Sequence, residues 1–128
     1  MLASILVAGV ATADVMEQAY RAYSDGDYQR ARELWLARAE QGDTAAQINL
    51  GTLYERGLGV ERDQAQALEW YRRAAESGDA DAQYQVGLMH ELGLGVESDI
   101  HEAEHWYQQA IDQGFCPGEL GDTAEIRR

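Results

Sequence analysis

Residues 43–78 read DTAAQINLGTLYERGLGVERDQAQALEWYRRAAESG, and residues 79–114 read DADAQYQVGLMHELGLGVESDIHEAEHWYQQAIDQG. A shift of 36 positions lays the second stretch onto the first. Identical pairs include Ala46 and Ala82, Gln47 and Gln83, Gly51 and Gly87, Gly57 and Gly93, Gly59 and Gly95, Val60 and Val96, Asp63 and Asp99, Ala67 and Ala103, Trp70 and Trp106, and Tyr71 and Tyr107. A period of this length indicates structural units that bury their apolar faces by stacking on one another.

Each copy predicts a pair of helices. Apolar residues recur at helical spacing over 43–56 and again over 63–77. Between these segments, Gly57 and Gly59 can adopt the positive φ that ends a helix. Asp63 with Gln66 predicts the start of the second helix, where the Asp63 side chain accepts from an early N–H group and Gln66 reaches back to the cap. Asp99 and Glu102 predict the same arrangement in the second copy, and Gly42, Gly78 and Gly114 mark the ends of the second helices.

Residues 14–42 predict a degenerate first unit. Ala31 and Trp35 continue the apolar stripe, but the turn at Gly26 and Asp27 is shorter than the Gly-x-Gly-Val loops of the later units. Terminal units of solenoids are commonly atypical because one of their faces meets solvent. After Gly114 the period stops, so residues 115–128 predict a C-terminal cap or tail, with either a short helix near 121–127 or a contact with another chain.

The repeated pattern A-Q-x3-G-x-L/M-Y/H-x2-G-x-G-V-x2-D-x3-A-x2-W-Y, at Ala46–Tyr71 and Ala82–Tyr107, resembles the Sel-one-like repeat, a relative of the tetratricopeptide repeat. The resemblance implies an all-α fold, an α/α solenoid of about three helix-turn-helix repeats, which binds proteins and has no active site or cofactor of its own. The sequence departs from the pattern at His90, where the family usually has tyrosine.

Charge narrows the class of partner. The chain has 23 acidic residues and 10 basic ones, all arginine, for a formal net charge of −13. Such a surface repels phosphate backbones, so nucleic acid is excluded as a partner. A protein or peptide with basic groups fits this charge, although acidic residues also serve simply to keep helices soluble. Cys116 is the single cysteine, which excludes an internal disulfide.

The first 13 residues predict export. They carry no charged side chain and end in Ala11-Thr12-Ala13, a small-x-small cleavage pattern that places the mature start at Asp14. The segment is too short to stay in a bilayer as an anchor. We therefore expect a periplasmic or secreted protein. The n-region lacks Lys and Arg, so two alternatives stay open: a start further upstream, or a buried N-terminal helix in a cytoplasmic protein.

One segment suggests chemistry. His101-Glu102-Ala103-Glu104-His105 satisfies H-E-x-x-H, in which two histidines one helical turn apart share a zinc ion and the glutamate activates water. Glu125 follows where some zinc peptidases place a third ligand. The repeat already explains this helix, however, and the histidines project away from the stripe of Ala103 and Trp106 towards solvent. A small zinc-dependent hydrolase is thus an alternative, and the expectation is no metal site and no enzyme.

A protein-binding surface is the favoured function. In helical-repeat arrays the first helices line the concave face, and their residues opposite the core stripe are free to contact a partner. These residues are Ile48, Thr52, Glu55, Tyr84, Leu88 and Glu91. Aromatic and aliphatic anchors ringed by carboxylates are typical of a peptide groove. Packing within the stack would explain the same residues, and a structural spacer in a cell-envelope assembly is a further alternative.

Overall fold

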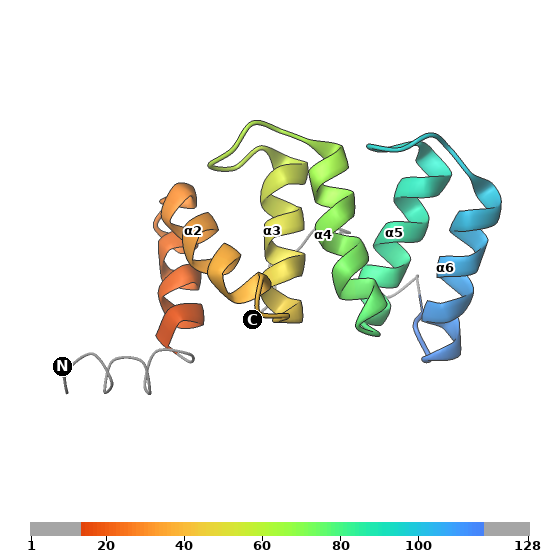
Figure 1. Cartoon of the computed structure of the whole chain (residues 1–128), viewed down its shortest axis with the longest axis horizontal. Coiled ribbons are helices and arrows are strands. Elements are labelled where there is room, and N and C mark those ends of the chain that lie inside the picture. Colours follow the sequence, from red (N-terminus) through yellow and green to blue (C-terminus); the bar gives the residue numbers. More distant parts are fainter. Residues whose placement is uncertain (1–13, 117–128) are drawn as a thin grey trace.

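The computed structural model describes residues 14–116. Within them the secondary structure is helical: a helix over 14–24, then α2 (Tyr28–Ala39), α3 (Thr44–Arg56), α4 (Gln64–Glu76), α5 (Ala80–Leu92) and α6 (Ile100–Asp112). Helices that follow one another in the sequence pack side by side, so the chain forms a row that ends at α6 (Figure 1). The predicted all-α solenoid of about three helix pairs is confirmed. The predicted signal peptide and the predicted C-terminal helix lie outside the described residues.

Each helix from α2 to α6 begins at an aspartate whose carboxylate accepts a hydrogen bond from the backbone N–H three residues later. These caps are Asp27, Asp43, Asp63, Asp79 and Asp99. Such caps satisfy N–H groups that have no partner inside the helix.

The caps predicted at Asp63 and Asp99 are confirmed, but the predicted reach of Gln66 and Glu102 back to the cap N–H is not observed. The N–H of Asp63 donates instead to the carbonyl of Tyr54, and that of Asp99 to the carbonyl of His90, each at 2.9 Å. The cap N–H group that Gln66 or Glu102 would accept from is therefore already bonded to the preceding helix.

The glycine loops connect units as well as helices. Gly57 and Gly93 end α3 and α5 with φ of 68° and 69°, as predicted. A Cβ added at Gly95 would lie 2.4 Å from the carbonyl carbon of Gln64, at the start of α4. The loop between α5 and α6 thus lies directly on the preceding unit, and Gly59 makes the equivalent approach to the start of α2 at Tyr28.

The core also crosses the boundaries between units. One cluster of buried side chains joins the helix over 14–24 and α2 to Leu50 and Leu53 of α3 and Trp70 of α4. A second cluster joins α4 to Val86 and Met89 of α5, and it includes Ile48 of α3 and Trp106 of α6. Stacking therefore buries the apolar stripes, as the sequence period predicts.

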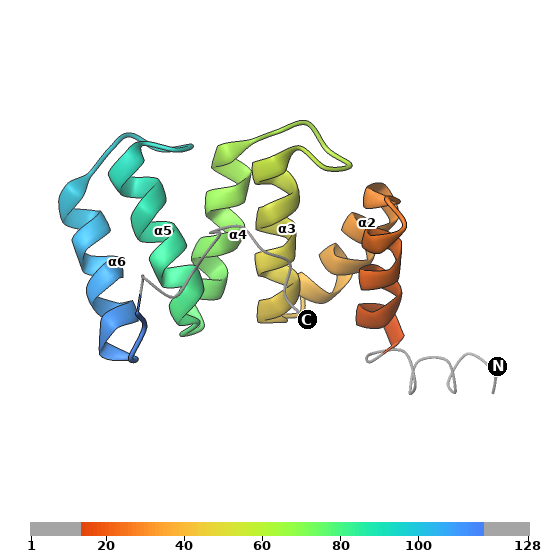
Figure 2. The ribbon, with the colours of Figure 1, turned by 180° about the vertical axis from the view of Figure 1, so that it is seen from behind.

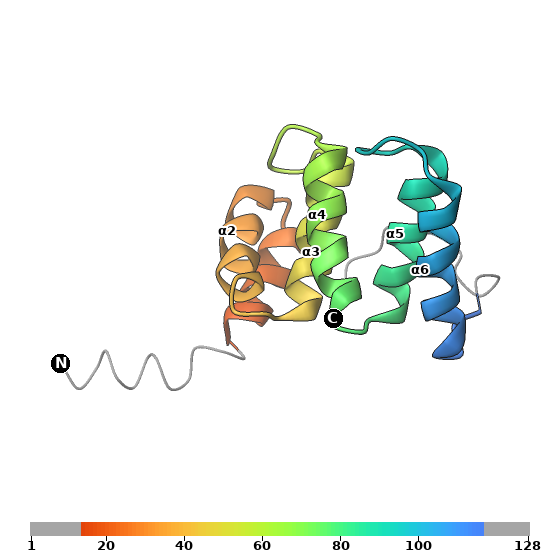
Figure 3. The same ribbon diagram turned by 45° about the vertical axis from the view of Figure 1, so that its right-hand side comes forward.

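The units form two layers of helices. The reverse view in Figure 2 follows the same order of helices from the opposite side, and in Figure 3 the second helices α4 and α6 lie nearer the viewer than the first helices α3 and α5. The candidate surface is formed by α3 and α5. Among residues 14–116, no helix combines the length and apolar character that a membrane crossing requires.

Candidate protein-binding surface

The six predicted binding residues occupy equivalent positions on α3 and α5. Ile48, Thr52 and Glu55 follow one another at intervals of four and three residues, which places them on one side of α3. Tyr84, Leu88 and Glu91 repeat this arrangement 36 residues later on α5. We call these six residues the first-helix surface. The two helices differ sharply in how much of it they leave accessible.

On α3, two of the six residues are not accessible. Thr52 has a relative exposure of 0% and Ile48 of 7%. The Thr52 Oγ1 donates to the Ile48 carbonyl at 3.1 Å and lies 3.2 Å from the Tyr71 hydroxyl of α4. The prediction that both residues are free to contact a partner is therefore wrong for this structure. The physical reason is that the Tyr71 side chain extends from α4 to α3. There it covers this side of α3 and lies within hydrogen-bond distance of the Thr52 hydroxyl.

The carboxylates of this surface are held by tyrosines of the second helices. The Tyr71 hydroxyl donates to Glu55 Oε2 at 2.8 Å, and the Tyr107 hydroxyl makes the same bond to Glu91 Oε2. Glu55 is half-buried and Glu91 is exposed. The units at 43–78 and 79–114 thus each present one glutamate whose orientation is fixed by a bond between the two helices of the unit.

Both tyrosines remain neutral at physiological pH. Burial, followed by the Glu55 carboxylate, raises the pKa of Tyr71 well above its usual range. Burial also raises the pKa of Tyr107, and its hydrogen bond to Glu91 acts in the same direction. The phenols therefore stay hydrogen-bond donors to the carboxylates.

On α5, Tyr84 and Leu88 are partly exposed. The Tyr84 ring contacts two other rings, with centroid distances of 5.3 Å to Tyr107 and 4.9 Å to Phe115. These three side chains form a row of tilted rings that joins α5, α6 and the chain immediately after α6. We call this row, together with Glu91, the aromatic row. Trp106 of α6 is buried, whereas its neighbour Tyr107 is partly exposed.

Tyr71, Tyr107 and Phe115 belong to the site but are absent from the predicted set. Helical spacing places both tyrosines next to the buried tryptophans of the second helices and does not show that their hydroxyls reach the first helices. A signal was present, because a glutamate precedes each tyrosine by 16 positions in both copies. Phe115 lies beyond the period, and no repeat position identifies its contact.

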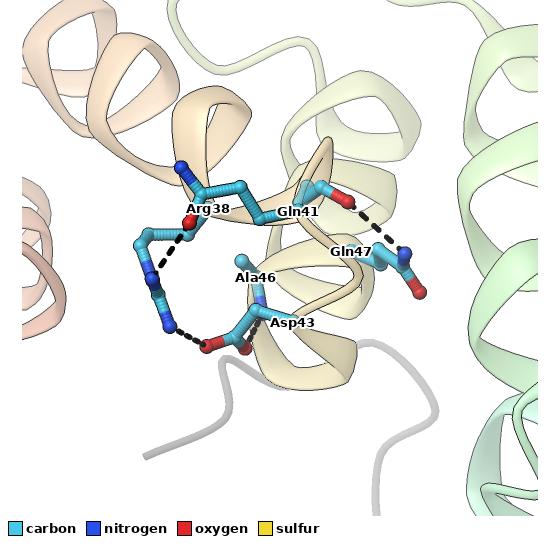
Figure 4. Close-up of polar contacts among 6 residues, drawn as sticks. Arg38, Gln41, Asp43, Ala46 and Gln47 are labelled. Atoms are coloured by element: carbon cyan, nitrogen blue, oxygen red, sulfur yellow. Dashed lines mark hydrogen bonds and ion pairs between the residues drawn. The ribbon is translucent and has the colours of Figure 1, made fainter. Parts of the chain in front are cut away.

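Glutamines fix the orientation of the first helices against the preceding unit. The Gln47 side chain donates to the Ala39 carbonyl at 3.1 Å, and Gln83 donates to the Ala75 carbonyl at 3.2 Å. At the first junction, Arg38 also contacts Asp43 at 3.4 Å while Asp43 caps α3 (Figure 4). Because these bonds cross the unit boundary, they set the positions of the residues that α3 and α5 present.

The histidine pair is exposed and separate from this surface. His101 has a side-chain exposure of 99%, with Nδ1 4.0 Å from a Glu104 carboxylate oxygen. His105 Nε2 lies 2.9 Å from the Gln109 amide nitrogen. Glu102, the residue that would activate water, accepts instead from Trp106 Nε1 at 3.0 Å. The part of the chain that the structure describes holds no group of three His, Cys, Asp or Glu side chains able to bind a metal ion.

Comparison with known proteins identifies the repeat. The sequence model of the Sel1 repeat matches residues 18–43, 44–79 and 80–115. Similar solved structures include a Sel1 repeat protein from Oxalobacter formigenes, at 36% identity and a TM-score of 0.72, and c5321, at 37% identity and a TM-score of 0.74. The latter is described as a protective antigen of uropathogenic Escherichia coli with an SLR fold. The alignments cover 78% and 79% of this chain but only 41% and 22% of those proteins. No curated protein matches the chain.

Proposed function

Because this chain belongs to the Sel1 repeat family, whose repeats generally mediate protein–protein interactions, we propose that it is a non-enzymatic interaction module. The proposed site is the accessible part of the first-helix surface: Glu55, Tyr84, Leu88 and Glu91. A protein or peptide partner contacts these residues, with Tyr84 and Leu88 as apolar anchors and the glutamates as polar contacts.

The observation that carries the proposal is the repeated Tyr–Glu hydrogen bond. Exposed glutamates normally lose side-chain entropy when they bind, which weakens association. Here Tyr71 and Tyr107 hold Glu55 and Glu91 in place before any partner arrives. Tyrosine is enriched at binding hot spots, and the partly exposed Tyr84 lies on the same helix as the pre-oriented Glu91.

We also propose that the protein acts outside the cytoplasm, in the periplasm or as a secreted protein. The apolar stretch at 1–13 with its Ala-x-Ala end supports this assignment. Expression of the full sequence in a bacterial host, followed by mass spectrometry of the periplasmic fraction, tests it. A chain that begins at Asp14 in that fraction supports export, whereas an uncleaved chain confined to the cytoplasm contradicts it.

Affinity capture tests the proposed surface. The full chain and a Tyr84→Ala, Leu88→Ala variant are used as baits in a cell-envelope extract, with Ile100→Ala, Ile111→Ala as the matched control. Ile100 and Ile111 are exposed apolar residues of α6, outside the first-helix surface. All baits must have equal helical content by circular dichroism. A partner that binds the full chain and the control but is lost by the first variant supports the proposal.

Three outcomes contradict the proposed surface. If both double variants retain the partner, binding occurs elsewhere on the molecule. If no association depends on any surface substitution, a spacer role is the better account. Loss of the partner only in the control variant would move the site to the exposed end of the solenoid.

A further inference from the structure

The two sequence copies differ most in positive charge. The unit at 43–78 contains four arginines, Arg56, Arg62, Arg72 and Arg73, and the positions 36 residues later hold Leu92, Ser98, Gln108 and Gln109. Residues 79–116 contain eight aspartates and glutamates and no lysine or arginine, so this region alone contributes −8 of the net charge of −13. Several acidic positions are retained: Glu91, Glu97 and Asp112 correspond to Glu55, Glu61 and Glu76, whereas His105 replaces Glu69.

In the preceding unit, arginines satisfy carboxylates and aromatic rings within the chain. On α4, Arg72 pairs with Glu76 and Arg73 pairs with Glu69, each at 3.5 Å. The Arg73 guanidinium also lies 4.6 Å from the centroid of the Trp70 ring. In the last unit, Gln108 at the position of Arg72 donates to Asp112 at 2.8 Å, a bond that leaves the negative charge uncompensated. Residues 79–116 contain no arginine or lysine, so a cation that contacts the carboxylates and rings of this unit comes from outside it.

The aromatic row is the place in the last unit where ring faces and a fixed carboxylate meet. Tyr84 and Phe115 are partly exposed, and Glu91 is exposed and held by Tyr107. A guanidinium or ammonium group is attracted to the face of an aromatic ring and gains further from a carboxylate in hydrogen-bond reach. Planar guanidinium groups in particular stack on tyrosine rings while donating to a carboxylate.

We propose that the aromatic row, with Tyr84, Tyr107 and Phe115 beside Glu91, receives an arginine or lysine side chain from a basic segment of the partner. The inference rests on the proposed function and names the class of partner for it. The corresponding place in the preceding unit differs, because Ile48 replaces Tyr84 and is buried. The cation site is therefore confined to the last unit, and it orients a basic partner segment towards that end of the solenoid.

Titration with defined peptides tests the proposal. The probes are two short Gly–Ser peptides that carry one central side chain, arginine in one and its uncharged isostere citrulline in the other. They are added to the isotope-labelled full chain, and NMR follows the ring resonances of Tyr84, Tyr107 and Phe115. We expect the arginine peptide to shift these resonances and to bind about tenfold more tightly than the citrulline peptide. Equal binding, or no shift of the three rings, overturns the proposal.

Two substitutions of equal charge separate a local site from general attraction to an acidic protein. Glu91→Gln removes the carboxylate of the row, whereas Glu97→Gln removes one negative charge in the loop between α5 and α6. We expect Glu91→Gln to reduce the affinity for the arginine peptide about fivefold, and Glu97→Gln to reduce it less than twofold. Tyr84→Leu keeps an apolar group without the ring and is expected to weaken binding about threefold. If both glutamate variants lose the same affinity, binding reflects general attraction to an acidic protein, and the proposed local site is wrong.

The peptide titration and the affinity capture distinguish a failure of the cation site from a failure of the proposed function. If the envelope partner is lost by the Tyr84→Ala, Leu88→Ala variant but the peptides are not distinguished, the surface binds a partner that is not recognised through a cation. If the peptides behave as expected but no partner depends on Tyr84 and Leu88, the row binds cations and the interaction function is wrong.

Discussion

The Tyr71 ring lies so close to Gly51 that a Cβ added at Gly51 would stand 2.6 Å from the Tyr71 Cε1 atom. Gly87 and Tyr107 repeat this relationship in the last unit, also at 2.6 Å. The glycine therefore sets how closely the two helices of a unit approach. That approach in turn brings each tyrosine hydroxyl to the glutamate of the first-helix surface.

Substitution of Gly51 and of Gly87 by alanine is expected to lower the free energy of unfolding by different amounts. In an ordinary helix Gly→Ala is stabilising by roughly 1 kcal/mol. At Gly51 the added methyl meets a fully enclosed Tyr71 ring, so Gly51→Ala should lower the free energy of unfolding by about 1–3 kcal/mol. Gly87→Ala should lower the free energy of unfolding by a smaller amount, because the half-buried Tyr107 ring can move. Urea unfolding of both variants measures the difference, and an equal or larger loss for Gly87→Ala would contradict it.

The loop between α5 and α6 lies on the preceding unit, and this contact predicts different stabilities for Gly93→Ala and Gly95→Ala. Gly93 and Gly95 have nearly equal φ, 69° and 71°, so alanine is strained to a similar extent at both. A Cβ at Gly93 meets its nearest atoms at 3.5 Å, whereas at Gly95 it meets backbone atoms of Gln64 and Ala65 at 2.4 to 2.5 Å. Gly95→Ala should therefore lower the unfolding free energy by about 1–3 kcal/mol more than Gly93→Ala. Parallel thermal and urea unfolding of the pair checks this expectation.

One missing hydrogen bond can be supplied. In the last unit, the Gln113 amide donates to Gln83 Oε1 at 2.7 Å, but the corresponding Gln47 Oε1 is buried without a partner. Ser77 occupies the position equivalent to Gln113. Ser77→Gln should bring a donor to Gln47 and raise the unfolding free energy by about 0.5–1.5 kcal/mol.

A variant of similar length without a donor serves as the control for this change. Ser77→Met adds comparable apolar surface but cannot bond to Gln47 Oε1, so it should show little of the gain. If Met stabilises as much as Gln, the effect comes from packing and the hydrogen-bond explanation fails.

The buried tyrosines predict a loss of stability in alkali. The pKa of Tyr71 is raised in the folded chain, whereas in the unfolded chain it has its ordinary value of about 10. The folded state therefore holds the phenol proton more tightly than the unfolded state. Its contribution to stability is complete below about pH 10 and falls as the pH rises above that value. Tyr71→Phe should reduce this decline, as measured by urea midpoints between about pH 9 and pH 11.

The same substitution has a separate effect near neutral pH. Tyr71→Phe removes the donor to Glu55 and should lower the unfolding free energy by about 1–2 kcal/mol. Tyr107→Phe is the comparison, because the pKa of Tyr107 is also raised. An alkaline decline that is identical in the wild type and in both variants would show that these phenols do not cause it.

The repeat allowed much of the fold to be predicted. Helix ends at Gly57 and Gly93 and helix starts at Asp63 and Asp99 follow from local rules of backbone conformation and capping, which depend on a few neighbouring residues. The exposed position of His101 and His105 followed in the same way, because the 3.6-residue period separates them from the stripe of Ala103 and Trp106.

The binding surface was predicted less completely, because it depends on contacts between helices. The sequence places Thr52 on one side of α3, but only the Tyr71 side chain of α4 removes it from that surface. Likewise, the aspartate N–H groups could have bonded to Gln66 and Glu102, and the course of the loop decided that they bond to Tyr54 and His90 instead. Such choices depend on which of several donors and acceptors the packing brings together.

The class of fold, the number of helices in each repeated unit and the charge difference between the units follow from the residue pattern alone, because periodicity, capping residues and charge are local or additive properties. Which polar groups bond inside the stack and which stay exposed depends on how the helices pack. Ile48 and Tyr84 occupy the same position in their units, yet one is buried and the other is part of a row of rings. The difference arises because burial depends on the neighbours that packing supplies, and these neighbours change from one unit to the next.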